Sequence, residues 1–168
     1  MKISSIIPLF AALAAVKAQI APGPYTIRSL ASDERGYVGR SPNEDTSINP
    51  KPILLLDNGN IDLWDVQPAT EGRYRLTIRN NPIGGFDDRL FAFPTNDPRI
   101  NLEWFITPVV GYGANNYIVE TAHKARGWVA PDALNPDRQL ALKPLIAGPS
   151  IPPFYPPFEV FTFTPLFS

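Results

Sequence analysis

The residue types that could carry catalysis are scarce in this chain of 168 residues. The chain has one histidine, His123, and no cysteine, which excludes Cys–His catalysis and metal sites built on several histidines. A Ser–His–Asp triad would have to use His123, but this residue lies in the segment Thr-Ala-His-Lys-Ala-Arg, and no Gly-x-Ser-x-Gly turn occurs. We therefore interpret His123 as a solvated loop residue.

Two pairs of adjacent carboxylates, Glu44-Asp45 and Asp87-Asp88, could suggest glycoside hydrolysis, which uses two carboxyl groups on either side of one bond. Neighbouring residues of a strand point to opposite faces, however, and both pairs lie in turn-like sequence. Solvated charge or turn capping explains them better. Phosphate-binding loops and dinucleotide fingerprints are also missing. The sequence thus predicts a protein that is not an enzyme, with no catalytic residues, no metal site and no cofactor.

A threefold repeat indicates the elements that must position any functional residues. A large aromatic residue, an apolar residue and a proline stand at alternate positions in Trp64–Pro68, Trp104–Pro108 and Phe161–Pro165. Side chains alternate along a strand, so the aromatic and apolar residues face the same side, and the proline marks the end of the strand. We expect the three aromatic residues to lie in the core and the function to lie in loops.

Short runs of β-branched and aromatic residues, separated by turn residues, predict twelve strands. They cover residues 25–28, 37–40, 53–56, 63–67, 74–79, 85–87, 90–93, 102–107, 117–121, 127–129, 140–143 and 158–164. Tyr25, Tyr74 and Tyr117 begin every fourth strand. The predicted fold class is therefore all-β, and the architecture is a β-trefoil of three pseudo-symmetric four-stranded modules. An irregular β-sandwich is the alternative.

The N-terminus is typical of a secretory signal peptide. Lys2 gives a positive start, residues 3–16 are almost all apolar or small, and Val16-Lys17-Ala18 fits a cleavage site. The apolar stretch is too short for a spanning helix, and an N-terminal membrane anchor is the alternative. We expect residues 1–18 to be removed and residues 19–168 to form a single β-trefoil domain that is secreted.

Composition narrows the classes of binding partner that are expected for this protein. The formal net charge is −1 without a basic patch, so nucleic acid is not an expected partner. No membrane partner is expected either. Without cysteine the domain is free of disulfides, and its stability must come from core packing and closure of the sheet. We expect a monomer that binds another protein.

Aromatic residues leave a carbohydrate-binding trefoil as a rival function, because lectins stack sugars on aromatic rings. The Gln-x-Trp triplet of ricin-type lectins is missing, and Trp64 and Trp104 fall at core-facing positions. The candidates for exposed aromatic residues are Tyr112, Tyr155 and Trp128.

A proline-rich segment, residues 148–157, is interpreted as a rigid strap across the barrel, with a ligand for a polyproline-reading domain as the alternative.

Several short motifs, taken in order, carry a resemblance to a known family. Gly39-Arg40 is followed by Asn-Glu-Asp-Thr-Ser at residues 43–47 and by Pro50-Lys51. Further matches are Gly23-x-Tyr25-x-Ile27, Trp64-x-Val66, Leu90-Phe91-Ala92, Trp104-x-Ile106, Tyr117-x-Val119-Glu120, Gly127-Trp128-Val129 and Pro149-Ser150 with Phe161. The chain thereby resembles the mushroom β-trefoil serine protease inhibitors, which are related to the mycocypin-type trefoil inhibitors.

The resemblance implies inhibition of a serine endopeptidase by the loop between the second and third strands. The implied protease-binding residues are Arg40, Ser41, Asn43, Glu44, Asp45, Thr46, Ser47 and Ile48. The family's reactive position falls near Thr46, whereas the basic residues Arg40 and Lys51 stand at the base of the loop. An internal ion-paired turn at Gly39-Arg40 and Glu44-Asp45 is the structural alternative, and it is compatible with an inhibitory role.

A secondary loop is implied at Asn80 and Asn81, between the fifth and sixth strands. In related mushroom trefoils an asparagine there addresses asparagine-specific endopeptidases, and other loops inhibit cysteine proteases. Ordinary turn chemistry explains the Asn-Asn-Pro sequence equally well. A trefoil that has kept the scaffold and lost inhibition is a further alternative.

Overall fold

The computed structural model describes residues 19–31, 36–57, 59–95, 97–132 and 135–167, which contain twelve strands and two single turns of 3-10 helix. The first six strands are β1 (Gly23–Ser29), β2 (Tyr37–Arg40), β3 (Lys51–Leu56), β4 (Trp64–Pro68), β5 (Tyr74–Ile78) and β6 (Asn81–Phe86). The others are β7 (Arg89–Ala92), β8 (Trp104–Pro108), β9 (Asn116–Thr121), β10 (Gly127–Val129), β11 (Ala141–Lys143) and β12 (Phe161–Pro165). The 3-10 turns are η1 (Thr70–Gly72) and η2 (Pro157–Glu159).

All twelve predicted strands overlap observed ones, so the all-β prediction is confirmed. The largest difference is β6, which was expected at residues 85–87 and begins at Asn81. Its first residues include Pro82 and two glycines, and because these residue types are depleted in strands the sequence pattern did not predict a strand there. The expected signal peptide, residues 1–18, lies outside the described residues. Within the described ranges, no helix is long and apolar enough to cross a membrane.

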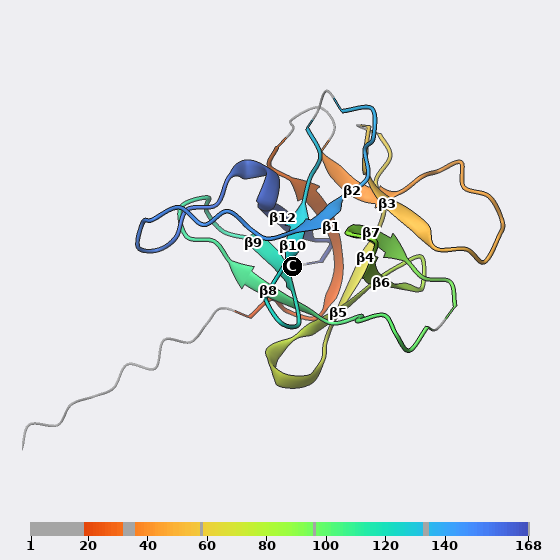
Figure 1. Cartoon of the computed structure of the whole chain (residues 1–168), viewed down its shortest axis with the longest axis horizontal. Helices are drawn as coiled ribbons and strands as arrows, with labels where there is room; N and C mark the ends of the chain where they lie inside the picture. The colour runs from red at the N-terminus through yellow and green to blue at the C-terminus, as the bar shows by residue number, and fades with distance from the viewer. Residues whose placement is uncertain (1–18, 32–35, 58, 96, 133–134, 168) are drawn as a thin grey trace, which may run out of the picture.

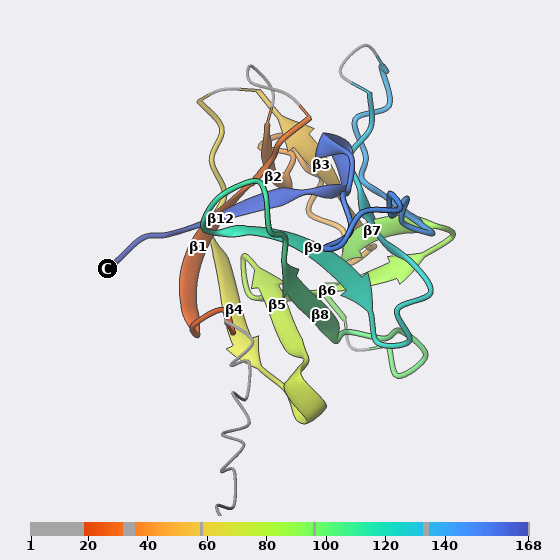
Figure 2. The same ribbon diagram turned by 90° about the vertical axis from the view of Figure 1, so that its left-hand side faces the viewer.

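Six strands form a closed ring of antiparallel neighbours. The successive pairs are β1–β4, β4–β5, β5–β8, β8–β9, β9–β12 and β12–β1. Figure 2 shows these six strands around the barrel. The described strands belong to one sheet, so a sandwich of two sheets is wrong for this chain. Closure satisfies the strand edges from within the molecule, which suits a domain that has no disulfide.

Three hairpins complete the three modules. They are β2–β3, β6–β7 and β10–β11, and β7 also pairs with β3 and with β11. Each module thus supplies two strands to the ring and one hairpin to the cap. This arrangement is compatible with the predicted β-trefoil, and it leaves the loop from β2 to β3 free to extend sideways from the cap (Figure 1).

The core confirms the placement of the repeated aromatic residues and corrects that of Trp128. Trp64, Trp104 and Phe161 are at most 1% exposed, as predicted. Trp128 was a candidate for an exposed aromatic residue, but it is fully buried, with ring centroids 5.8 Å from Trp64, 5.6 Å from Trp104 and 5.8 Å from Phe161. In the third module the ring strand carries the smaller Phe161, and the indole of Trp128 on the adjoining hairpin packs against it.

The proline-rich segment differs from the predicted strap. Its base is closed by the Gly148 N–H, which donates to the Phe154 carbonyl at 2.7 Å, and Tyr112 stacks on the Phe154 ring. The tip residue Ile151 is fully exposed, and the segment extends away from the barrel on the side opposite the β2–β3 loop (Figure 1). Tyr112 and Tyr155 are half-buried in this packing, because the Tyr112 hydroxyl donates to the Tyr155 carbonyl at 2.7 Å.

Candidate functional site

The loop from β2 to β3, residues 41–50, is the candidate site that the sequence predicts. It projects from the barrel as the orange segment at the right of Figure 1. Its exposed members are Pro42, Asn43, Asp45, Thr46, Ile48, Asn49 and Pro50, whereas Ser41, Glu44 and Ser47 are half-buried. The residues at its two ends, Arg40 and Lys51, are buried, at 7% and 5% exposure. A charged side chain is buried only where it has partners, so both ends are expected to be braced.

Arg40 braces the first arm of the loop. Its Nε donates to the Glu44 carboxylate at 2.9 Å, and its Nη1 donates to the Asn81 Oδ1 at 2.6 Å. The side chains of Arg40 and Glu44 are 9% and 11% exposed. The internal ion-paired turn that the sequence left open is therefore present. The guanidinium of Arg40 points inward, so this residue holds the loop and does not present a cation at its tip.

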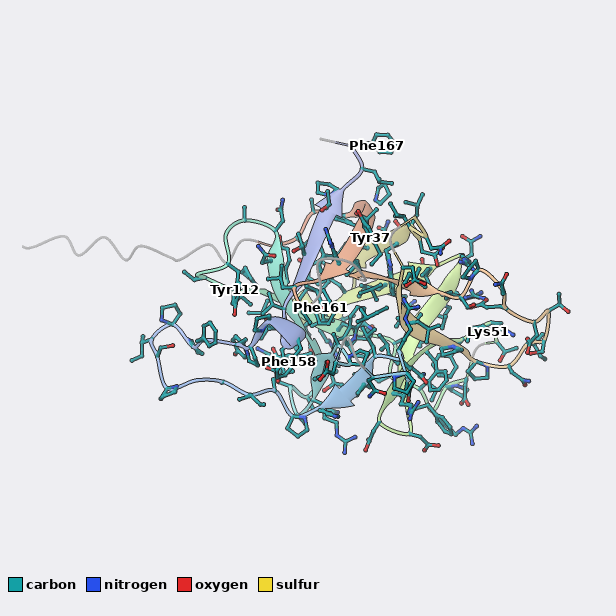
Figure 3. All side chains as sticks on the ribbon, turned by 90° about the horizontal axis from the view of Figure 1, so that it is seen from above. Tyr37, Lys51, Tyr112, Phe158, Phe161 and Phe167 are labelled. Atoms are coloured by element: carbon teal, nitrogen blue, oxygen red, sulfur yellow. The ribbon has the colours of Figure 1, made fainter. Side chains whose placement is uncertain are left out.

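Lys51 braces the second arm. Its Nζ donates to the Asp45 carbonyl at 3.2 Å, to the Ser47 Oγ at 3.0 Å and to the Asp45 carboxylate. The Ser47 hydroxyl and N–H also donate to the Asp45 Oδ1, at 2.6 and 3.0 Å. Figure 3 shows Lys51 where the projecting loop joins the barrel. We call this set the Lys51 clamp, and it holds the two residues that flank Thr46 while Thr46 itself is exposed.

The Asp45 carboxylate of the clamp stays ionised over the neutral range. The hydrogen bond from Lys51, followed by those from the Ser47 side chain and backbone, lowers the pKa of Asp45 from 3.8 to about 2. A carboxyl whose pKa is lowered on folding contributes stability above its unfolded pKa and loses it as the pH falls through the folded value. The lowered pKa of Asp45 therefore contributes its full stability above about pH 4, and this contribution is lost as the pH falls through about 2.

Two residues that sequence reasoning missed tie the loop to the rest of the molecule. Asp62, between β3 and β4, accepts the backbone N–H of Arg40 at 2.8 Å. Arg79, in the β5–β6 turn, pairs with Asp62 at 2.8 and 2.9 Å and donates to the carbonyls of Arg40 and Ser41, both at 3.2 Å. No motif signals these contacts, because the partners lie between 17 and 39 residues apart in sequence.

The predicted secondary loop lies beside the first. Ile78 pairs with Asn81, and the two residues between them, Arg79 and Asn80, have φ of 49° and 62°, as in a type I′ turn. Asn80 is exposed at the turn. Asn81 is half-buried, and its amide oxygen is occupied by Arg40, so it cannot be presented in the way that Asn80 is. The structure thus joins the two predicted loops through Arg40, Arg79 and Asn81.

The groups first considered for catalysis are dispersed over the surface. His123 is an exposed loop residue, as predicted. Asp87 and Asp88 occupy the β6–β7 turn with φ of 48° and 58°, and Asp88 pairs with Arg126. Over the described ranges, no group of three or more acidic or histidine side chains is placed to hold a metal ion. The arrangement that remains is a rigid, projecting loop suited to binding another protein.

Comparison with known proteins identifies the family. The family model for peptidase inhibitor I66 matches residues 18–165, and this chain belongs to that family. A protein named serine protease inhibitor from Lentinula edodes is 34% identical over 137 residues, covering 81% of this chain and 94% of that protein. The structure of a proteinase inhibitor from Coprinopsis cinerea matches with a TM-score of 0.79 and 33% identity, over 88% of this chain and all of that one.

A designed threefold symmetric protein, ThreeFoil, also matches, with a TM-score of 0.61 and 14% identity over 85% of this chain and 99% of that chain. A likeness at this identity shows the fold alone. The resemblance to the mushroom inhibitors is therefore confirmed, and the two relatives above both come from mushrooms. Membership of a family of protease inhibitors also confirms that the protein is not an enzyme, and it gives the chain a protease as its partner.

Proposed function

We propose that the protein inhibits serine endopeptidases by presenting the 41–50 loop to the protease active site, with Thr46 entering the specificity pocket. The observation that carries this proposal is the Lys51 clamp. One buried ammonium group binds Asp45 and Ser47, the neighbours of Thr46, and leaves Thr46 exposed between them. The similarity to the Lentinula edodes protein that is named serine protease inhibitor supports the serine class.

Rigidity is what distinguishes an inhibitory loop from a good substrate. Association loses free energy when loops and side chains become ordered, and a loop that is already fixed avoids most of that loss. Here the loop is held at both arms, by Arg40 with Glu44 and by Lys51 with Asp45. The Asp45 carboxylate is ionised at the neutral pH at which serine endopeptidases act, and its pKa, lowered to about 2, keeps it ionised well into the acid range.

The side chain at the reactive position sets the target. Trypsin-like enzymes bind a basic side chain against an aspartate in the pocket, and the basic residues Arg40 and Lys51 are buried and occupied as braces. Thr46 is small and exposed, which fits a shallow, uncharged pocket of the elastase type. We infer that trypsin is not the best target of this chain.

Thr46→Arg tests the assignment. We expect this variant to gain trypsin inhibition by roughly a hundredfold, because leaving a buried interfacial charge such as the pocket aspartate without its partner costs about 2–5 kcal/mol, and the added arginine supplies that partner. The inhibition constant is measured against trypsin, chymotrypsin, elastase and subtilisin. Asn49→Arg is the matched control, because it adds the same cation to the same loop outside the clamp. A gain for Asn49→Arg without a gain for Thr46→Arg would place the reactive position elsewhere, and no inhibition of any of the four enzymes by the wild type at micromolar protein would contradict the proposal.

Asn80 supports a second candidate, inhibition of an asparaginyl endopeptidase, because it is exposed in a tight turn. Adding that enzyme to the panel with Asn80→Ala separates the two sites.

Carbohydrate binding has lost its main support, because Trp128 is buried and Tyr112 and Tyr155 are engaged in packing. We further propose that the protein is a secreted, monomeric β-trefoil, with residues 1–18 as its signal peptide.

A further inference from the structure

Two residues outside the loop, Asp62 and Arg79, contact the backbone at the point where the loop begins. β2 ends at Arg40, the last of its residues in register with β3, opposite Ile53, and Ser41 lies beyond the end of the strand. Backbone N–H and C=O groups that leave a strand need other partners. Asp62 accepts the Arg40 N–H at 2.8 Å, and Arg79 donates to the Arg40 and Ser41 carbonyls at 3.2 Å.

The two residues also fix each other. The Nε and Nη2 of Arg79 donate to the two oxygens of Asp62 at 2.9 and 2.8 Å, which is the paired geometry that a guanidinium makes with a carboxylate. The Asp62 side chain is only 12% exposed, and that of Arg79 is 40% exposed. Each side chain therefore reaches the first residues of the loop from a fixed direction.

The position of Arg79 adds a second observation. It has φ of 49°, a left-handed conformation that is uncommon for a residue other than glycine. The next residue but one, Asn81, accepts a hydrogen bond from the Arg40 side chain at 2.6 Å. The β5–β6 turn belongs to the second module, whereas the loop belongs to the first. Side chains at this turn thus contact both the backbone and the Arg40 side chain at the base of the loop.

We propose that Asp62 and Arg79 are positioning residues that set the direction in which the 41–50 loop leaves the barrel, and that this direction decides whether a bound protease is inhibited or cleaves the loop. The proposal rests on the proposed function, in that this loop enters the protease. Without the pair, the Lys51 clamp still shapes the tip, but the tip is no longer held at one angle to the barrel. A protease then binds a mobile segment, which it processes as a substrate.

The test compares Asp62→Asn, Arg79→Met and the conservative Arg79→Lys with a matched control, Arg73→Met. Arg73 follows the η1 turn and, like Arg79, donates to a backbone carbonyl, that of Thr70 at 3.2 Å, but it lies between β4 and β5, away from the loop. Each variant is incubated with subtilisin, and three quantities are measured: the inhibition constant, the rate at which mass spectrometry detects cleavage within residues 41–50, and the melting temperature.

We expect Arg79→Met and Asp62→Asn to weaken inhibition and to speed loop cleavage by roughly tenfold each, the size expected when a preorganised loop must be ordered on binding. Arg79→Lys should recover only part of this loss, because an ammonium group cannot reproduce the paired contact with Asp62. Arg73→Met should change neither quantity. Melting temperatures of Arg79→Met and Arg73→Met should agree, which separates positioning from general stability.

Unchanged inhibition and unchanged loop cleavage in Arg79→Met and Asp62→Asn, beside a wild type that inhibits, would overturn the positioning role and leave the proposed function standing. A loss of inhibition that follows the melting temperature and disappears on cooling would overturn it as well. If the wild type does not inhibit subtilisin, the proposed function fails against this enzyme. The cleavage rates still decide the positioning role in that case, because faster cleavage in the variants than in Arg73→Met supports it and equal cleavage overturns it.

Discussion

One buried carboxylate, that of Glu159, illustrates how this disulfide-free domain orders an irregular segment. Glu159, in η2, is 1% exposed, and both of its oxygens accept the backbone N–H of Ile146, at 2.9 and 3.0 Å. It ties the chain just before the proline-rich segment to η2, the 3-10 turn just after it. Burial raises the pKa of Glu159, and the hydrogen bond from Ile146 offsets this only in part. The contribution of Glu159 to the stability of the folded state therefore depends on pH.

The sign of that dependence gives a prediction for Glu159→Gln. A carboxyl whose pKa is raised on folding binds its proton more readily in the folded state, so stability is lost as the pH rises from its unfolded pKa through its folded one. An amide oxygen can still accept the Ile146 N–H but carries no charge to desolvate. We expect the melting temperature of Glu159→Gln, relative to the wild type, to be higher at pH 7 than at pH 4. Glu71→Gln, at a side chain 82% exposed, is the control, and an equal difference at both pH values would contradict the prediction.

At the scale of elements, β2 contains a glycine, Gly39, whose lack of a side chain makes room for a contact that holds the 41–50 loop. Gly39 is followed by the residue at which the loop begins, and a Cβ at Gly39 would come within 2.6 Å of the Leu56 Cδ1 and 2.9 Å of the Asp62 side chain. Glycine here allows the carboxylate of Asp62 to approach the backbone of β2 and accept the Arg40 N–H. The hairpin thus supplies both the loop and the space for its brace.

Gly39→Ala should therefore affect function and stability together. We expect a loss of about 1–3 kcal/mol in the free energy of unfolding, as for overpacking in a filled interior, and weaker protease inhibition because Asp62 is displaced. Gly127→Ala is the matched control. An added Cβ there would meet Leu145 at 2.7 Å, but in β10 of the third module, a strand that pairs with β9 and β11 and not with β2 or β3. Equal loss of inhibition in the two variants, measured beside urea unfolding, would contradict a specific role for Gly39.

At the scale of the whole molecule, one aromatic cluster connects all three modules. Trp128 lies against Trp64 of the first module, Trp104 of the second and Phe161 of the third. The indoles of Trp64 and Trp104 each donate to a carbonyl of β2 or β6, whereas among the described residues that of Trp128 has no hydrogen-bond partner. The position of Trp128 is thus held by packing, and the three modules should unfold as one cooperative unit.

Trp128→Ala should cost about 3–5 kcal/mol of the free energy of unfolding, the range for removing a large buried aromatic side chain. Urea unfolding followed by fluorescence and circular dichroism gives the midpoint and slope, and we expect a single transition by both probes. Ile151→Ala, at a fully exposed residue, is the control and should change the stability by less than about 0.5 kcal/mol. Two separate transitions in the wild type would contradict the single cooperative core.

Much of the fold could be predicted because its signals are local. Alternation of apolar residues, prolines at strand ends and the repeat at Trp64, Trp104 and Phe161 depend only on neighbours in sequence, and they located all twelve strands. Trp128 was misplaced because its surroundings come from three modules, and no nearby residue shows that the third ring strand carries a smaller aromatic side chain. The candidate loop was located through its resemblance to a family, but its bracing was not.

The sequence by itself therefore determined the strands, the repeat that groups them and the segment in which a function would lie. Tertiary structure decided which residues of that segment are free to act. Arg40 and Lys51 carry the charges that sequence would offer to a protease pocket, yet both are buried and held by hydrogen bonds, Arg40 to Glu44 and Asn81 and Lys51 to Asp45 and Ser47. Asp62 and Arg79 reach the loop only because the ring brings β4 and β5 together, and the physical reason is that hydrogen bonds depend on distance in space and not on separation along the chain.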